Sequence, residues 1–408
     1  MKRLLLVTHR SIEQAGGPAA RWRAFARYLP EYGWEVEVLS AAVRAGASEF
    51  DASASRAVAT RAAAMARLAR WTEPTFGLAG VRPDSLPLSM LWIPRGAALV
   101  RRAMRRQEPD VVLATGPPIA GLIAARAGVR PPTPLVVELR DLWAGNPAFD
   151  AGGTALSKVE SWLLSEVRRV VACTPEAVSD LRLRHPTLGE RVVEISNGFD
   201  PEISSLAPTT SNGAPPRAGA KRQALTLLHS GTLTPARPIA PLVRALSDPR
   251  VAGDFKIALH GHLSAGSRAE VERAVRESQV PIEVFAPSSW EEAVGRIAVA
   301  DAGLILQARG AGDETAVASK VYEYLALGKP PLCITDGGAS EALLRRLGAD
   351  ELCARLGAPE TIVAALVRLR EGAFRPPCAA RLAPYSRRAL AGRMAELLED
   401  VTNGWRNA

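Results

Sequence analysis

SKVYEYLALGKP, residues 319–330, predicts a short helix with two defined ends. Ser319 is a candidate N-cap, because its hydroxyl can accept a hydrogen bond from a free backbone N–H group of the first turn. Gly328 suits the left-handed position after the last turn, and the proline two residues later stops the helix. Lys320 and Glu323 are three residues apart and therefore occupy neighbouring positions on the polar side.

A polar loop that contains glycine, residues 309–315, precedes this helix. A helix N-terminus behind such a loop, with Lys320 in its first turn, is a natural site for a diphosphate. Glu323 could then accept hydrogen bonds from paired hydroxyls such as those of a ribose. The alternative interpretation is an ordinary surface helix in which Lys320 and Glu323 form an ion pair without a ligand.

The composition is that of a large globular protein. The chain has 408 residues, of which 47% are hydrophobic, and this length favours two domains. The net charge of +9 comes from 51 basic and 42 acidic residues, so anionic ligands, an anionic membrane and nucleic acid are all conceivable partners. We find no lysine-rich run, zinc-type spacing or recognition helix, and therefore expect no nucleic acid partner.

The cysteines and the apolar segments indicate a compartment. Four cysteines without a CxxC pair suggest reduced thiols in a cytoplasmic protein. The apolar run at residues 4–7 is too short for a signal peptide and fits a first buried strand. No apolar stretch is long enough to span a bilayer.

Strand and helix patterns alternate along the chain, and the alternation restarts near residue 224. Each half therefore predicts a Rossmann-like unit with a parallel sheet. The predicted strands are residues 4–7, 34–39, 110–114, 134–139, 169–173 and 191–195 in the first half, and 224–229, 256–260, 282–285, 302–306 and 331–334 in the second. The predicted helices include residues 19–32, 54–71, 92–106, 157–168, 239–247, 267–278, 290–298 and 387–401.

We therefore predict an α/β fold with two Rossmann-like domains that face each other across a cleft. The first domain covers residues 1–200, and a linker rich in Pro, Ser, Thr, Gly and Ala covers 201–222. The second domain covers residues 223–384. The terminal segment 385–408 follows the completed second domain and could pack back on the first.

In open parallel sheets, ligands bind outside the carboxyl ends of the strands. The polar and glycine residues expected at these ends are Gly16, Gly17, Gly116, Arg140, Asp141, Asn197 and Gly198 in the first half, and Gly231, Arg237, Gly261 and the segment 310–323 in the second. The glycines do not match the GxGxxG fingerprint, which argues against a nicotinamide or flavin enzyme.

Residues 45–107 are less regular and contain two predicted helices rich in arginine. Basic helices with an apolar face can lie on an anionic membrane. The alternative is that the arginines only solvate an outer face. His260 and His262 form an isolated His-x-His pair, for which a structural role is expected rather than a metal site.

The chain resembles the GT-B fold retaining glycosyltransferases of the family 4 type, also called glycosyl transferases group 1. The resemblance covers nearly the whole chain. It rests on the ordered motifs at residues 16–21, 116–118, 140–143, 196–200, 230–237 and 319–330.

The resemblance implies a donor of the nucleotide-diphospho-sugar type, bound mainly by the second domain, with neither a metal nor another cofactor. The implied donor-binding residues are Gly16, Gly17, Gly231, Arg237, Lys320, Val321 and Glu323, of which Arg237 and Lys320 hold the diphosphate. The implied acceptor-binding residues are Arg21, Gly116, Arg140 and Trp143.

Two departures from the family pattern affect the implied catalytic residues. The family has two glutamates with seven residues between them, and counting back from Glu323 gives Thr315. Either the loop is reset so that Glu314 faces the sugar, or the role of this position is lost. Many relatives have a histidine near the end of the fourth strand, where Asp141 stands here.

The resemblance thus implies a glycosyltransferase that acts with retention and without metal, and we expect a small-molecule or lipid-linked acceptor. Its place would be the cytoplasm, with a peripheral contact to the inner face of the membrane as one option. Two alternatives stay open: a nucleotide-sugar 2-epimerase, and a nucleotide-sugar-binding module that has lost catalysis.

Overall fold

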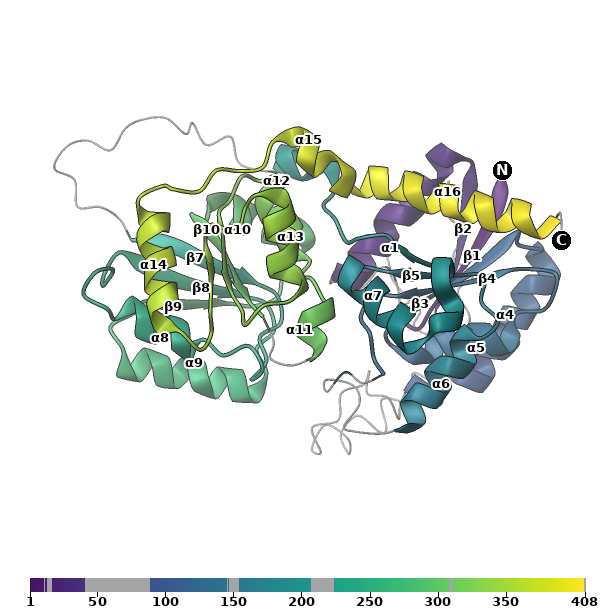
Figure 1. Cartoon of the computed structure of the whole chain (residues 1–408), viewed down its shortest axis with the longest axis horizontal. Helices are drawn as coiled ribbons and strands as arrows, with labels where there is room; N and C mark the ends of the chain where they lie inside the picture. The colour runs from purple at the N-terminus through teal and green to yellow at the C-terminus, as the bar shows by residue number, and fades with distance from the viewer. Residues whose placement is uncertain are drawn as a thin grey trace. The chain divides into compact units, whose positions relative to one another are not determined.

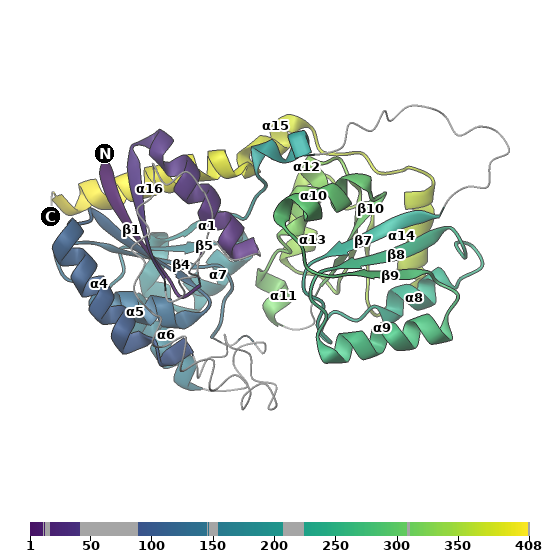
Figure 2. The same ribbon diagram turned by 180° about the vertical axis from the view of Figure 1, so that it is seen from behind.

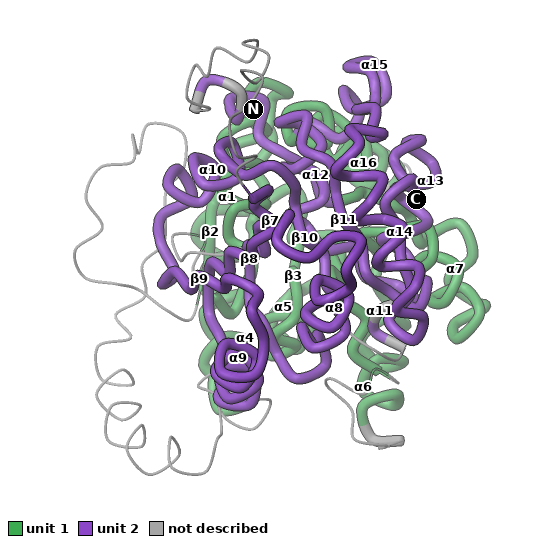
Figure 3. The backbone as a smooth tube through the Cα atoms, turned by 90° about the vertical axis from the view of Figure 1, so that its left-hand side faces the viewer, with its two compact units in different colours: residues 1–196, 387–408 green, residues 197–386 purple. Residues whose placement is uncertain are grey.

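The computed structural model describes residues 1–10, 12, 17–40, 89–144, 146, 154–206, 224–307 and 311–406. The chain divides into two compact units (Figure 3). The first unit comprises Met1–Ser196 and Arg387–Ala408, and the second comprises Asn197–Ser386. Gly16, the predicted helix 54–71 and most of the predicted linker lie outside the described residues.

The first unit contains a six-stranded sheet in the order β2-β1-β3-β4-β5-β6, and every described pairing is parallel. Its strands are nearly continuous runs of Val, Leu and Ala, as expected for a parallel sheet buried on both faces. They are β1 Lys2–Thr8, β2 Trp34–Ser40, β3 Val111–Gly116, β4 Leu135–Leu139, β5 Arg169–Ala172 and β6 Val192–Glu194.

Alternate residues of each strand enter two different cores, because side chains of a strand point alternately to its two faces. Leu5 and Val7 of β1 pack with α4, α5, α6 and α7. Leu4 and Leu6 pack with α1 and α16 on the other face (Figures 1 and 2). These helices are α1 Gly17–Tyr28, α4 Ile93–Gln107, α5 Ile119–Gly128, α6 Thr154–Leu164, α7 Pro175–Arg184 and α16 Arg387–Arg406, with the 3₁₀ helices η1 Leu29–Tyr32 and η2 Pro186–Arg191.

The second unit contains a six-stranded sheet in the order β12-β11-β10-β7-β8-β9, again parallel in every described pairing. Read from β9, this is the strand order of a dinucleotide-binding Rossmann sheet. The strands are β7 Leu225–Ser230, β8 Phe255–His260, β9 Ile282–Phe285, β10 Ala302–Leu306, β11 Pro331–Ile334 and β12 Cys353–Ala354. The predicted fold class of two Rossmann-like α/β domains is thus confirmed.

Helices again cover both faces of this sheet. One core joins α8, α9 and α14 to one face, and the other core joins α10, α12 and α13 to the opposite face (Figure 1). The helices are α8 Ala240–Leu246, α9 Ala265–Glu277, α10 Trp290–Val299, α11 Ala311–Thr315, α12 Lys320–Ala326, α13 Ala339–Leu347, α14 Pro359–Arg370 and α15 Ala379–Leu382, with η3 Pro201–Leu206 and η4 Ala383–Tyr385.

The predicted helix at residues 319–330 exists as α12, but one of its two ends differs from the prediction. Gly328 has a φ of 66° and occupies the left-handed position, as expected. The prediction that the Ser319 side chain caps this helix is wrong, because Ser319 already has helical backbone angles and its side chain makes no capping hydrogen bond. The preceding segment, predicted as a loop, contains α11.

Among the helices in the described part of the chain, none is both long and apolar enough to cross a membrane.

Candidate functional site

The carboxyl ends of β7 and β10 form the switch point of the second sheet. These strands are neighbours, yet β7 leads to α8 on one face and β10 leads to α12 on the other. The two connections therefore diverge and leave the strand ends accessible, which is where ligands bind in open α/β sheets. Gly231 follows β7, and Gln307 follows β10.

Tyr324 fixes α12 against this edge. Its buried hydroxyl donates to the carbonyl oxygen of Leu228 at 2.9 Å and accepts from the backbone N–H of Ser230 at 3.2 Å. The ring lies directly over Gly303 in β10, where an added Cβ would come within 2.2 Å of it. Burial raises the pKa of Tyr324, so the hydroxyl stays protonated and able to donate.

The polar side of α12 carries two of the residues predicted to bind a donor, Lys320 and Glu323. Lys320 Nζ is bonded to Glu323 Oε2, so the ion pair predicted as the alternative interpretation is present. The indole Nε1 of Trp290 donates to the other carboxylate oxygen, Oε1, at 3.3 Å. Glu323 is only 4% exposed, whereas Val321 beside it is fully buried and contributes to the core.

Arg237 lies in the loop that follows β7. It is half-buried, and its Nη1 donates to the carbonyl oxygen of Thr232 at 3.2 Å. The neighbouring His229 is buried at the end of β7, with Nδ1 3.2 Å from the carbonyl oxygen of Leu304. The pKa of His229 is lowered to about 4, mainly by burial; the hydrogen bond to the Leu304 carbonyl opposes this shift, and the positive charge of Arg237 adds to it.

His260, at the end of β8, lies between two serine hydroxyls. Its Nδ1 is 3.2 Å from Ser230 Oγ, and its Nε2 is 2.9 Å from Ser288 Oγ. Burial lowers the pKa of His260, and the positive charges of Arg296 and Lys320 act in the same direction. The loop after β7 thus carries Arg237 and the helix after β10 carries Lys320, and the pKa values of the nearby His229 and His260 are lowered.

Gln307 and Ser340 hold the segment between β10 and α12. Gln307 Nε2 donates to the carbonyl oxygen of Ala316 at 3.2 Å. Ser340 Oγ donates to Gln307 Oε1 at 2.8 Å and accepts from the backbone N–H of Ala318 at 3.1 Å. Glu314, in α11, is exposed. The approach to Lys320 is therefore fixed by two polar side chains that sequence reasoning missed.

At the carboxyl edge of the first sheet, Arg21 and Glu138 form a buried network. Arg21 Nε donates to Glu138 Oε1 at 3.0 Å, and Glu138 is completely buried. Arg21 also donates to the carbonyl oxygens of Ile195 and Ser196. Glu138 Oε2 accepts from Trp22 Nε1 at 2.7 Å and from Thr115 Oγ1 at 2.6 Å.

This network joins the start of α1 to β3, β4 and the end of β6. Arg21 was predicted to contact an acceptor, and the structure places its guanidinium inside the first unit instead, 4% exposed. The signal for Glu138 was available in the sequence, since an acid inside the apolar run 135–139 needs a partner when buried.

The other residues predicted for the first domain lie near the end of β4. Arg140 donates from Nη2 to the carbonyl oxygen of Pro117 and from its backbone N–H to Gly116 O. Burial lowers the pKa of Arg140, and the charges of Glu138 and Asp141 act against that shift. Asp141 is half-buried, whereas Trp143 is 1% exposed and belongs to the core.

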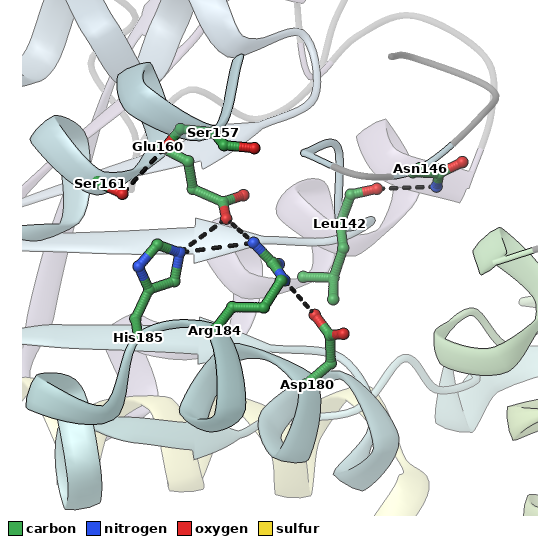
Figure 4. A network of polar contacts seen from close by, with 8 residues as sticks. All are labelled: Leu142, Asn146, Ser157, Glu160, Ser161, Asp180, Arg184 and His185. Atoms are coloured by element: carbon green, nitrogen blue, oxygen red, sulfur yellow. Dashed lines mark hydrogen bonds and ion pairs between the residues drawn. The ribbon is translucent and has the colours of Figure 1, made fainter. Parts of the chain in front are cut away.

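A second charged network anchors α6 to α7 in the same unit (Figure 4). Glu160 of α6, which is fully buried, accepts from Arg184 Nη1 and lies 2.9 Å from His185 Nε2. Asp180 holds the same arginine from its other side, at 2.7 Å from Nε. Asn146 Nδ2 donates to the carbonyl oxygen of Leu142 and closes the turn after β4 at 2.8 Å.

Comparison with known proteins agrees with this architecture. Residues 16–198 match the family model described as Glycosyl transferase 4-like domain. No curated protein sequence matches the chain. Among solved structures, a glycosyltransferase from Rickettsia africae is similar, with 14% identity and a TM-score of 0.62 over 98% of both chains.

Two further solved structures are similar over almost their whole length. A trehalose-phosphate synthase from Burkholderia vietnamiensis has 15% identity and a TM-score of 0.66, over 99% of this chain and 100% of that one. HepE from Anabaena has 15% identity and a TM-score of 0.58, over 100% of this chain and 99% of its own. Residues 16–198 thus match a glycosyl transferase 4-like domain, and the chain shares the two-sheet GT-B fold of these solved structures.

Proposed function

We propose that the chain transfers a sugar from a nucleoside diphosphate sugar, and that the carboxyl edge of the second sheet holds this donor. Arg237 and Lys320 would bind the diphosphate, Glu323 the ribose hydroxyls, and the backbone at Gly231 and Val321 would line the site. The observation that carries the proposal is the place of two half-buried cations, Arg237 in the loop after β7 and Lys320 at the start of the helix after β10, at the switch point between these two strands.

This arrangement suits the chemistry of the leaving group. When the bond between the sugar and the diphosphate breaks, negative charge grows on the diphosphate oxygens. Fixed cations and backbone dipoles that point at this charge stabilise the transition state. We propose that Arg237 and Lys320 fill the role that a divalent ion has in other enzymes, and that the sugar keeps its anomeric configuration.

Ligands of the structural neighbours support a donor of this kind. HepE was solved with UDP and glucose, and a trehalose-6-phosphate structure from E. coli was solved with UDP-2-fluoro glucose. These ligands belong to those proteins. The base and the sugar of this chain's own donor can be identified with a panel of nucleotide sugars.

The acceptor is proposed to bind to the first unit. Gly116 and Arg140 would contact it near the end of β4. Asp141 is proposed as a catalytic residue of the first unit, and Glu314 as one of the second. Gly16 lies outside the described residues, and Gly17 begins α1. Because Arg21 and Trp143 are buried, they would shape this region through the backbone that they support.

The surface of α4 favours the proposal that the acceptor is lipid-linked and lies at the inner face of a membrane. This helix contains no acidic residue, and its solvent side exposes Arg102, Arg105 and Arg106. Leu91, just before the helix, is 66% exposed. If the wild-type protein cosediments with anionic vesicles and an Arg102→Glu/Arg105→Glu variant does not, a contact between α4 and the membrane is supported. Equal binding of both proteins would contradict it.

The proposed activity can be tested with a panel of nucleotide sugars. The protein is incubated with UDP-, GDP-, ADP- and dTDP-sugars and candidate acceptors, and release of nucleoside diphosphate is measured with and without EDTA. Acceptor-dependent release that survives EDTA is expected. Analysis of the product by NMR then shows whether the anomeric configuration is retained.

The same assay separates the alternatives. Conversion of a donor without any acceptor would indicate an epimerase instead. A rise in melting temperature with nucleoside diphosphate, but no turnover with any acceptor, would indicate a binding module.

A further inference from the structure

The Glu323 carboxylate is held from both sides before any ligand arrives. Lys320 Nζ is bonded to Oε2, and Trp290 Nε1 donates to Oε1 at 3.3 Å. The carboxylate is almost completely buried. A carboxylate offers about four acceptor positions, so two remain after these contacts.

Trp290 reaches Glu323 from a different element. It is the first residue of α10, whose N-cap Ser289 accepts from the backbone N–H of Glu292 at 3.2 Å. α10 and α12 contribute to the same core on one face of the second sheet. The indole therefore starts from a fixed backbone position, and its ring is half-buried.

The two donors to Glu323 differ in how well they can orient it. Lys320 has a flexible four-carbon stem, and its ammonium can turn toward a phosphate when one binds. The indole is rigid and has one N–H group at a fixed place on its ring. Trp290 is therefore the donor that keeps the plane of the carboxylate constant when Lys320 changes partner.

We propose that Trp290 is a positioning residue that aims the Glu323 carboxylate at two neighbouring hydroxyls, so that the site selects ribonucleoside over 2′-deoxyribonucleoside diphosphates. This inference rests on the proposed donor site. The 2′- and 3′-hydroxyls of a ribose donate to the two remaining acceptor positions. A 2′-deoxy nucleotide leaves one buried carboxylate position without a donor, which is the kind of mismatch that binding sites reject most strongly.

The experiment measures the dissociation constants of UDP, ADP and GDP and of their 2′-deoxy counterparts by titration calorimetry. Because a hydrogen bond to a charged group contributes about 1.5–3 kcal/mol, wild-type protein is expected to prefer the ribose form by about 10- to 100-fold. Trp290→Phe keeps an aromatic ring but lacks the N–H group. It should reduce this preference to about threefold or less, mainly by weakening the ribose form.

Trp162→Phe is the matched control, because Trp162 is an exposed tryptophan in the first unit and lies far outside this contact set. It should leave the preference unchanged. If Trp290→Phe weakens both forms equally, or if wild-type protein binds both forms equally well, the inference is overturned. Failure of the wild-type protein to bind any of the six nucleotides would instead contradict the proposed donor site itself, and the inference with it.

Discussion

The carboxyl edges of the two sheets use their cations in opposite ways. In the first unit, Arg21 is buried and its charge is neutralised by Glu138, which is buried as well. In the second unit, Arg237 and Lys320 remain half-buried, although Lys320 pairs with Glu323, and the pKa values of His229 and His260 are lowered. A buried cation stabilises backbone geometry, whereas a half-buried cation can still meet an anionic ligand.

Among the changes that test this difference, removal of Arg21 should cause the largest loss of stability. Arg21→Ala leaves Glu138 buried without its counter-charge, and breaking a buried pair in this way costs about 3–5 kcal/mol. Urea unfolding followed by tryptophan fluorescence measures the loss. Lys256→Ala, which removes a lysine from an exposed pair with Glu283, is the control and should have little effect.

A different outcome would give Arg21 the role that the sequence predicted. If Arg21→Ala has the same free energy of unfolding as the wild type but a higher KM for the acceptor, the guanidinium contacts the substrate and does not stabilise the fold.

His229 should make the second unit sensitive to acid. Its pKa falls from the usual 6.5 to about 4 in the fold, so the unfolded chain binds a proton at a higher pH than the folded chain does. The free energy of unfolding that depends on neutral His229 is fully present above pH 6.5, and it decreases as the pH falls toward 4. The wild type should therefore lose more stability over this interval than His229→Asn, by on the order of 3 kcal/mol.

The measurement is the free energy of unfolding of both proteins between pH 4 and 7. His262→Asn, a replacement at an exposed histidine two residues beyond β8, is the control. Parallel pH profiles for the wild type and His229→Asn would show that burial of the imidazole does not shift its titration.

Gly303→Ala should displace α12 at a smaller cost. The new Cβ would lie 2.2 Å from the ring of Tyr324, and overpacking of this kind costs about 1–3 kcal/mol. Thermal unfolding measures the loss, and nucleotide affinity should fall with it because Lys320 and Glu323 belong to the displaced helix. Gly295→Ala in α10 meets open space and should be neutral or slightly stabilising. Equal behaviour of the two variants would contradict the close packing of α12.

Local sequence patterns predicted most strands of the second unit well. β9, β10 and β11 have the predicted ends, and the last two are short apolar runs. The start of α7 follows from local sequence as well, since Thr174 caps it and Pro175 takes the first position. The end of α6 was placed too late, because apolar spacing continues past Leu164 in the sequence while the helix stops there.

The parts of the site that depend on distant contacts could not be predicted in the same way. Lys320 and Glu323 were identified because both stand on one short helix. Trp290 is bonded to Glu323 across 33 residues, and Arg21 to Glu138 across 117, so no local spacing connects them. Only a polar residue within an apolar strand, such as Glu138 or His229, signals that a partner must exist, and it does not say which.

In the proposed donor site, Arg237 and Lys320 at the edge of the second sheet bind a diphosphate, and Lys320 turns to it from its partner Glu323. Calorimetric affinities of UDP, ADP and GDP and of the corresponding nucleosides, compared between the wild type and Lys320→Ala, test it most directly, with Lys256→Ala as the control. Lys320→Ala is expected to weaken the binding of the nucleoside diphosphates about tenfold or more and to leave the affinity for the nucleosides almost unchanged. An equal loss of affinity for both ligands would contradict it.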